Sequence, residues 1–257
     1  MTRLAVAGGT TVLNPPASDI PDIRGLKEYN ADLLADFDER NTVDSPPRIT
    51  HVGLVDLLLA GGGAQARPDL VVLAYALPDV HPFVTTSAYL NWKLGNEAAS
   101  FAVSEQGLLA PFSAVRIASA YGSRSFALAV LEQTALPNDD PLVRDNDLVD
   151  SGALLYFGEG RLGVDAVRTA DTVRECRDGV EPAASGRTLV VDGPWVRHSL
   201  VDGADGYRAP EGTYCTSVWL ALADRHADWE SRYDTVILHD TDPRSGRCAS
   251  LVLRSRG

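Results

Sequence analysis

The chain has 257 residues, 45% of them hydrophobic and 23% charged, so it is long enough for one large domain or two closely packed halves around a substantial core. Its formal net charge of -12 argues against nucleic acid, whose phosphates are bound by clustered Lys and Arg, and against an anionic membrane surface. No stretch reaches the apolar length that spans a bilayer, and the first residues, MTRLAVAGGTTVLN, lack a cleavage-site pattern, so we expect a cytoplasmic protein without signal peptide or anchor.

The first half of the chain alternates predicted helices and strands. A helix with an apolar stripe is predicted over 49–60, where three glycines follow it. The continuous apolar run over 70–76 predicts a strand that is covered on both faces. A further helix is predicted over 85–94 and ends at Gly95. This alternation is typical of an α/β sandwich with a largely buried sheet.

An order of helix, strand, acidic loop and strand then occurs twice along the chain. In the first copy, the helix is predicted over 108–121 and the strands over 126–131 and 152–157. In the second copy, the helix is predicted over 213–227 and the strands over 234–239 and 248–253. A polar bridge containing Gly and Pro lies between them. We therefore predict a duplicated α/β unit with one half at 1–171, a linker at 172–187 and a second half at 188–257.

The segment 99–121 is predicted to be a buried strand that runs into a long apolar helix, with V-S-E-Q-G-L-L-A-P-F at the junction. This junction resembles the active-site turn V-G-Q-Q-N-C-x-x-P of ketoacyl synthase III and related thiolase-like condensing enzymes, which are also built from two similar halves. In that family a cysteine heads the helix, whose N-terminus lowers the pKa of the thiol. The resemblance places Leu108 at this position, or Gly107 if the register is shifted by one residue, so the nucleophile is missing.

The same resemblance implies an α/β fold of thiolase-like duplicated αβα halves with a truncated second half. Only residues 192–212 separate the predicted strand 188–191 from the following helix, so we expect a strand and its helices to be missing there. The family's catalytic histidine lies in a strand-end motif of the type GFHQAN, which His198 in WVRHSLVDG does not match. Matching residues 217–222 to the family's S-x-P-L-A-L run places Gly212 at its catalytic asparagine.

Further residues are expected to line or fill the former pocket. His81 follows the end of a buried strand, where α/β sheets usually place ligand contacts, although a loop histidine without function is the more common situation. Ser104 and Glu105 could replace the nucleophile or base, but polar residues at a strand end more often satisfy backbone groups. The resemblance implies the same pocket for Gln106, Gly107, Leu109 and Phe112.

The sequence predicts neither a metal site nor a cofactor. Cys176, Cys215 and Cys248 are scattered and lack C-x-x-C spacing, which fits a reducing compartment better than a disulfide framework or a zinc site. His239 and Asp240 belong to an H-D-x-D run in a strand-to-strand turn, where Asp serves backbone geometry. The glycines match no nucleotide-binding motif, and no G-x-S-x-G elbow of a hydrolase is present.

Decarboxylative condensation needs a thiolate and a His/Asn pair that stabilises an enolate oxygen. Because all three positions are vacant, the resemblance implies a non-catalytic subunit that shapes the acyl pocket of a cysteine-bearing ketoacyl synthase homologue in fatty acid, polyketide or other secondary metabolite biosynthesis. The family's dimers pair a central strand across the interface, here 100–104, so the partner is such a homologue or a second copy of this chain. Acyl carrier protein or acyl-CoA would dock on the partner, since acidic carrier proteins are repelled by this acidic chain.

Two alternatives remain open at this point. The first is a stand-alone acyltransferase or thioesterase that uses Ser104, Glu105, His81 or the H-x-x-x-D pair of His198 and Asp202. The second is a homodimeric binding protein that sequesters a pathway intermediate.

Overall fold

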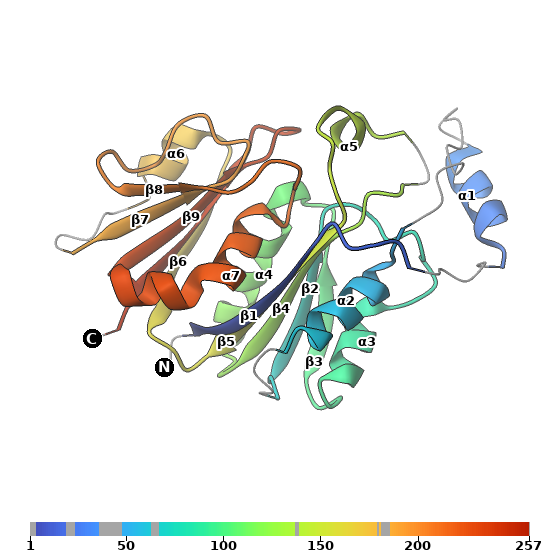
Figure 1. Cartoon of the computed structure of the whole chain (residues 1–257), viewed down its shortest axis with the longest axis horizontal. Coiled ribbons are helices and arrows are strands. Elements are labelled where there is room, and N and C mark those ends of the chain that lie inside the picture. The colour runs from blue at the N-terminus through green and yellow to red at the C-terminus, as the bar shows by residue number, and fades with distance from the viewer. Residues whose placement is uncertain are drawn as a thin grey trace.

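The computed structural model describes residues 4–18, 24–35, 48–62, 67–136, 139–178, 180 and 186–256. Its strands are β1 (Ala5–Leu13), β2 (Leu70–Tyr75), β3 (Ala99–Val103), β4 (Phe126–Glu132), β5 (Ser151–Gly158), β6 (Leu162–Ala170), β7 (Thr188–Asp192), β8 (Asp205–Arg208), β9 (Thr235–Thr241) and β10 (Cys248–Ser255). Its helices are α1 (Leu26–Leu34), α2 (His51–Ala60), α3 (Thr86–Lys93), the 3₁₀ helix η2 (Gly107–Leu109), α4 (Ala110–Tyr121), α5 (Pro141–Asp145), α6 (Val173–Asp178) and α7 (Ser217–Arg232). Figure 1 shows the helices distributed around the strands.

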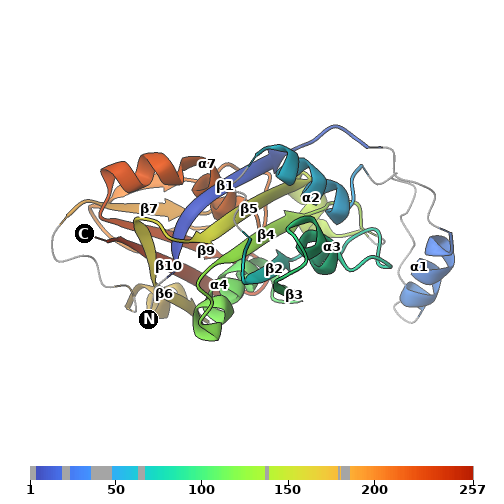
Figure 2. The same cartoon turned by 90° about the horizontal axis from the view of Figure 1, so that it is seen from below.

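The described strands form one sheet in the order β3-β2-β4-β5-β1-β6-β10-β9-β7-β8. The first five form one arm, and the second five repeat the same arrangement in reverse, so that β6 corresponds to β1, β7 to β2 and β8 to β3. In each arm the three strands at the outer end are parallel, and their inner neighbour, β5 or β10, is antiparallel to them. The predicted duplication is therefore confirmed. Figure 2 shows the two arms as one continuous, twisted layer from β3 to β7.

The second arm is shorter in its helices, and the expectation that it lacks a strand is wrong. β6 and β8 were both overlooked in the sequence, and together with β7, β9 and β10 they complete five strands. Only α6 lies between β6 and β7 in the described part of the chain, whereas α1 and α2 precede β2. None of residues 193–204 is helical, whereas α3 connects β2 to β3. Because β6 occupies the place that β1 has in the first arm, we place the boundary of the duplication at the turn 159–161.

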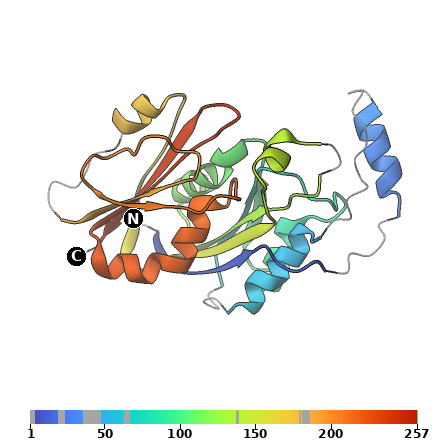
Figure 3. The same ribbon diagram turned by 45° about the horizontal axis from the view of Figure 1, so that its top comes forward.

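Three apolar clusters hold the layers together. The largest contains α4, α7 and the inner face of strands from both arms, and Phe112 of α4 packs edge-to-face on Trp219 of α7 with 4.9 Å between the ring centroids. A second cluster places α2 and α3 on the outer face of the first arm. A third places α6 on the outer face of the second arm. Figure 3 shows α6 and α7 on opposite sides of the second arm's strands.

Local sequence explains where the helices begin and end. The Thr50 side chain accepts a hydrogen bond from the Gly53 amide and so caps α2 at its N-terminus. Pro111 occupies the first turn of α4, where its missing N–H costs nothing, and Gly122 ends the helix with a left-handed φ of 75°. None of the helices in the described ranges is long and apolar enough to cross a bilayer.

Candidate functional site

The chain enters α4 through a tight turn that follows β3. Glu105 and Gly107 have φ values of 59° and 54°, in the left-handed region, so the backbone reverses direction within a few residues. The turn leads into η2, where Leu108 and Leu109 are 1% and 2% exposed. The start of this helix therefore presents apolar side chains to the core between the two arms.

A buried carboxylate joins the first arm to the start of α7. The side chain of Glu132, at the end of β4, accepts hydrogen bonds from the backbone amides of Tyr214 at 2.8 Å and Cys215 at 2.6 Å. These amides lie just before the N-terminus of α7, whose positive dipole end favours a negative charge. Burial nevertheless dominates and raises the pKa of the Glu132 carboxyl to about 7.

The Tyr214 ring occupies the space beside Gly107. Its hydroxyl donates to Asp242 Oδ1 at 2.7 Å, and a Cβ atom built on Gly107 would lie 2.7 Å from the same hydroxyl oxygen. Trp195 packs edge-to-face on the Tyr214 ring, and the Arg244 guanidinium lies 5.6 Å from its centroid. We call Tyr214, Asp242, Trp195 and Arg244 the tyrosine plug. The plug and the start of α4 are in direct contact, so the junction between α4 and α7 is filled by protein side chains.

A second buried carboxylate lies where β7 leaves the sheet. Asp240 Oδ2 accepts a hydrogen bond from the Ser217 hydroxyl at 2.5 Å, and Oδ1 accepts one from the Thr241 amide. Burial raises the pKa of the Asp240 carboxyl to about 8. A Cβ atom on Gly193 would lie 2.0 Å from this carboxylate, so no residue larger than glycine fits directly after β7.

No family model and no curated protein matches the chain. Its structure is similar to AbyA1, a tetronic acid condensing enzyme, with a TM-score of 0.64 and 12% identity over 98% of this chain and 100% of that one. It is also similar to 3-oxoacyl-(acyl carrier protein) synthase III from Pseudomonas aeruginosa, with a TM-score of 0.62 and 17% identity over 99% of both chains. The chain has a thiolase-like fold.

The structure is also similar to 3-oxoacyl-[acyl-carrier-protein] synthase III from Aquifex aeolicus, with a TM-score of 0.62 and 12% identity over 98% of this chain and 99% of that one.

Within this thiolase-like fold, Leu108, Leu109 and Phe112 belong to the large core cluster between the arms. Gln106 is exposed, and its side-chain oxygen accepts a hydrogen bond from the Ser113 hydroxyl at 2.5 Å. The start of α4 is thus held by apolar packing toward the core and by the hydrogen bond between the Ser113 and Gln106 side chains.

The polar residues considered as substitutes do not form a catalytic pair. Ser104 is half-buried and Glu105 is exposed, and no described side chain hydrogen-bonds to either of them. His81 lies in the loop between β2 and α3, where its backbone amide binds Asp79 and its ring packs on Phe83. A nucleophile needs a base within hydrogen-bond reach, and the structure shows none for Ser104.

Gly212, expected at the family's asparagine position, and the H-x-x-x-D pair lie in the loops on either side of β8. Gly212 has a φ of 85°, and its carbonyl oxygen accepts a hydrogen bond from the Val149 amide at 2.9 Å. The nearest atom to a Cβ built there is the Asp147 carbonyl oxygen at 3.6 Å, but the left-handed φ would strain any side chain placed at this position. His198 and Asp202 are both exposed in the loop between β7 and β8, and they make no hydrogen bond to any described side chain.

Cys215 is a feature that the sequence analysis missed. It precedes the first residue of α7 by two positions, as Leu108 precedes the first residue of α4, so the duplication places a cysteine at the equivalent helix start. Burial and then the charge of Glu132 raise the pKa of the Cys215 thiol, which contacts the Leu131 carbonyl oxygen at 3.5 Å. This thiol therefore lacks the activation that a nucleophile requires.

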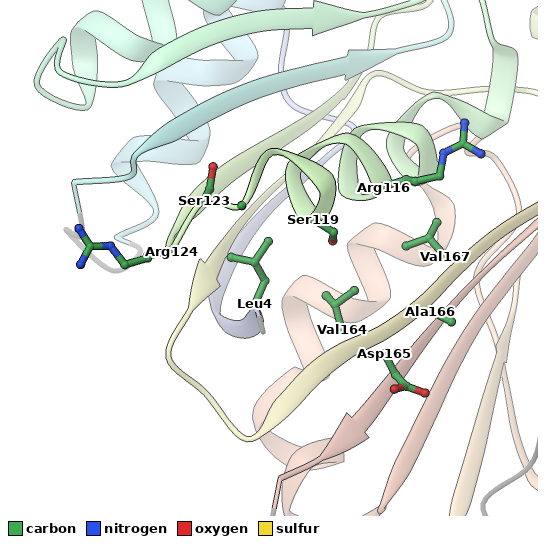
Figure 4. A pocket seen from close by; sticks show the side chains of 10 residues that line it. Leu4, Arg116, Ser119, Ser123, Arg124, Val164, Asp165, Ala166 and Val167 are labelled. Atoms are coloured by element: carbon green, nitrogen blue, oxygen red, sulfur yellow. The ribbon is translucent and has the colours of Figure 1, made fainter. Parts of the chain in front are cut away.

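A surface cavity of about 320 Å³ lies between the C-terminal end of α4 and β6 (Figure 4). Figure 4 shows Leu4, Ser119 and Val164 around the space, with Arg116 and Arg124 extending away from each other at its ends. The two guanidinium groups do not converge on a common anion. Leu108 precedes the other end of α4, so this cavity is separate from the junction between α4 and α7.

Proposed function

We propose that this chain is the non-catalytic subunit of a ketoacyl synthase III-like condensing enzyme and that it shapes the acyl pocket of a cysteine-bearing homologue. The observation that carries the proposal is the contact between the tyrosine plug and Gly107. An acyl chain that reached the start of α4 would have to displace the Tyr214 ring, whose hydroxyl is bound to a buried carboxylate. Breaking such a charge-assisted hydrogen bond without replacement costs about 1.5–3 kcal/mol.

The residues at the three catalytic positions support the same reading. Leu108 can neither hold a thioester nor be activated by the helix dipole. Gly212 carries no side-chain amide to stabilise an enolate oxygen. No residue matches the family's catalytic histidine motif, since His198 in WVRHSLVDG lacks its flanking residues.

The free edge of the sheet supports an interaction with a second subunit. β3 pairs only with β2 among the described strands, so its other edge has unpaired backbone groups. Ile117 and Tyr121 of α4 are 39% and 64% exposed and add apolar surface to the first arm. Pairing of β3 with the same strand of a homologue, or of a second copy, would cover the free edge.

A stand-alone acyltransferase or thioesterase finds less support. The candidate groups for that activity, Ser104, Glu105, His81 and the pair of His198 and Asp202, are neither paired with one another nor gathered in one cavity. Such an enzyme remains an outcome that the following experiment can detect.

The test is co-expression with a cysteine-bearing ketoacyl synthase homologue from the same gene neighbourhood. We expect a complex with one copy of each chain, measured by light scattering after gel filtration, and condensation of acyl-CoA with a malonyl donor by the complex alone. Ala102→Arg places a charge on the exposed edge of β3 and should abolish the complex. Ala227→Arg makes the same change on the exposed face of α7 and should leave the complex intact.

Two results would contradict the proposal. One is a stable homodimer that does not associate with the homologue, which would favour the sequestering protein. The other is condensation, or release of CoA from acyl-CoA, by the isolated chain.

A further inference from the structure

Three metal-binding side chains meet on the outer face of the second arm. Cys176 of α6, His239 of β9 and Cys248 of β10 are all buried, and their ligand atoms lie within 4.8 Å of one another. No other group of three or more such ligands occurs in the described part of the chain. The two cysteines are scattered in the sequence, which predicts no metal site, because the three residues come from segments far apart along the chain.

Strand register and helix packing bring these residues together. In the β9–β10 ladder, His239 lies opposite Ser250 and Thr241 lies opposite Cys248, so the imidazole and the thiol share one face. That face is covered by α6, whose Cys176 belongs to the same apolar cluster as Cys248. The site is thus enclosed between a helix and two strands.

The hydrogen bonds of His239 leave one ring nitrogen available. Nδ1 lies 3.1 Å from Asp192 Oδ1, and because a carboxylate oxygen accepts hydrogen bonds, we assign the proton of this contact to Nδ1. Nε2 is buried and has no hydrogen-bond partner among the described residues. A carboxylate that holds the far nitrogen of a histidine is the usual support for a metal-binding imidazole. An unpaired buried nitrogen is otherwise costly, so its presence points to a missing ligand.

We propose that Cys176, Cys248 and Nε2 of His239 bind a zinc ion. Two thiolates and an imidazole suit Zn²⁺, whereas Mg²⁺ and Ca²⁺ prefer oxygen ligands. At Zn–S distances of about 2.3 Å, a tetrahedral site separates its two sulfur atoms by about 3.8 Å, so the side chains need to close by only about 1 Å or less. Metal binding requires both cysteines as thiolates, so any proton on the Cys176 or Cys248 thiol is released to solvent when zinc binds.

The position of the site indicates a structural role. His239 faces α6, whereas the next residue, Asp240, faces α7 and the junction with α4, so the sheet separates the zinc site from that junction. α6 has six residues and is the helix that covers this face in the described ranges. Zinc would fix this short helix to β9 and β10, and this inference stands whether or not the proposed function is correct.

The test uses the full chain, reduced and stripped of metal with a chelator, with Zn²⁺ and Co²⁺ as probes. We expect one Zn²⁺ per chain, a higher melting temperature with Zn²⁺, and thiolate-to-cobalt charge-transfer absorption with Co²⁺. Cys176→Ser and Cys248→Ser should lose all three effects. Cys215→Ser makes the same change outside the cluster and should keep them. Asp192→Asn keeps every ligand and should weaken binding about 10- to 100-fold.

If the ligand variants fail to fold, three measurements still test the proposal. These are the zinc stoichiometry of the wild type, its cobalt absorption spectrum, and the zinc affinity of Asp192→Asn. The proposal is overturned if the reduced wild-type chain binds no Zn²⁺ or gives a cobalt spectrum without thiolate bands. It is also overturned if Cys215→Ser abolishes binding as completely as Cys176→Ser. A Cys176–Cys248 disulfide that forms in air, together with absence of zinc binding after reduction, would indicate a redox pair instead.

Discussion

Replacing Glu132 with glutamine should change how the stability of the fold depends on pH. The pKa of this buried carboxyl is raised from 4.5 to about 7, so the folded state holds its proton more tightly than the unfolded state does. The resulting stabilisation is fully present below pH 4.5 and is lost as the pH rises through about 7. At about 1.4 kcal/mol for each tenfold difference in proton affinity, the loss amounts to about 3 kcal/mol.

The assay is urea denaturation of both proteins across this pH range, followed by tryptophan fluorescence. The free energy of unfolding of the wild type should fall by about 3 kcal/mol relative to that of Glu132→Gln as the pH rises. Taking the difference between the two profiles removes contributions that both proteins share, including that of Asp240. Glu159→Gln, at an exposed turn, controls for the loss of one negative charge and should give a profile parallel to the wild type. Parallel profiles for wild type and Glu132→Gln would refute the reasoning.

Four further substitutions test the junction between α4 and α7 and its surroundings. Gly107→Ala should cost about 2–4 kcal/mol because it combines a left-handed φ with a close approach to the Tyr214 hydroxyl. Tyr214→Phe removes that oxygen, so the double variant should be destabilised by less than the sum of the two single variants, with a difference of at least about 1 kcal/mol. Additive losses in the free energy of unfolding, measured in urea, would argue against the contact. Gly193→Ala should destabilise the fold by more than about 3 kcal/mol. Gly206→Ala has no atom within 4 Å of its Cβ and should stay within about 1 kcal/mol of the wild type. Equal melting temperatures for these two variants would contradict this prediction. Leu108→Cys should leave the isolated chain unable to condense acyl-CoA with a malonyl donor, because the histidine and asparagine are still missing, and extension of a bound acyl group would disprove it.

The strands and helices with strong apolar patterns could be predicted from the sequence. The run over 70–76 became β2, and the helix predicted over 108–121 became η2 and α4. β6 was overlooked because Asp165 and Arg168 interrupt its apolar pattern, as expected for a strand that is only half-buried. β8 was overlooked because it is a four-residue edge strand of mostly exposed residues, which carries little signal.

The contents of the candidate site were less predictable than its position. The resemblance predicts that Leu108 stands at the vacated helix start. Nothing near Tyr214 in the sequence indicates that its hydroxyl reaches Gly107, since the two residues lie more than a hundred positions apart. The same limitation applies to Cys176, His239 and Cys248. Their proximity depends on the β9–β10 register and on the packing of α6, which only the folded chain displays.

The position of β1 has a consequence for the order of assembly. β1 lies between β5 and β6 in the sheet, and it forms the seam at which the two arms meet. As the chain leaves the ribosome, β1 must wait until residue 158 has been made before its partner strand β5 is complete. Such distant pairing slows folding and exposes an unpaired strand to aggregation in the meantime.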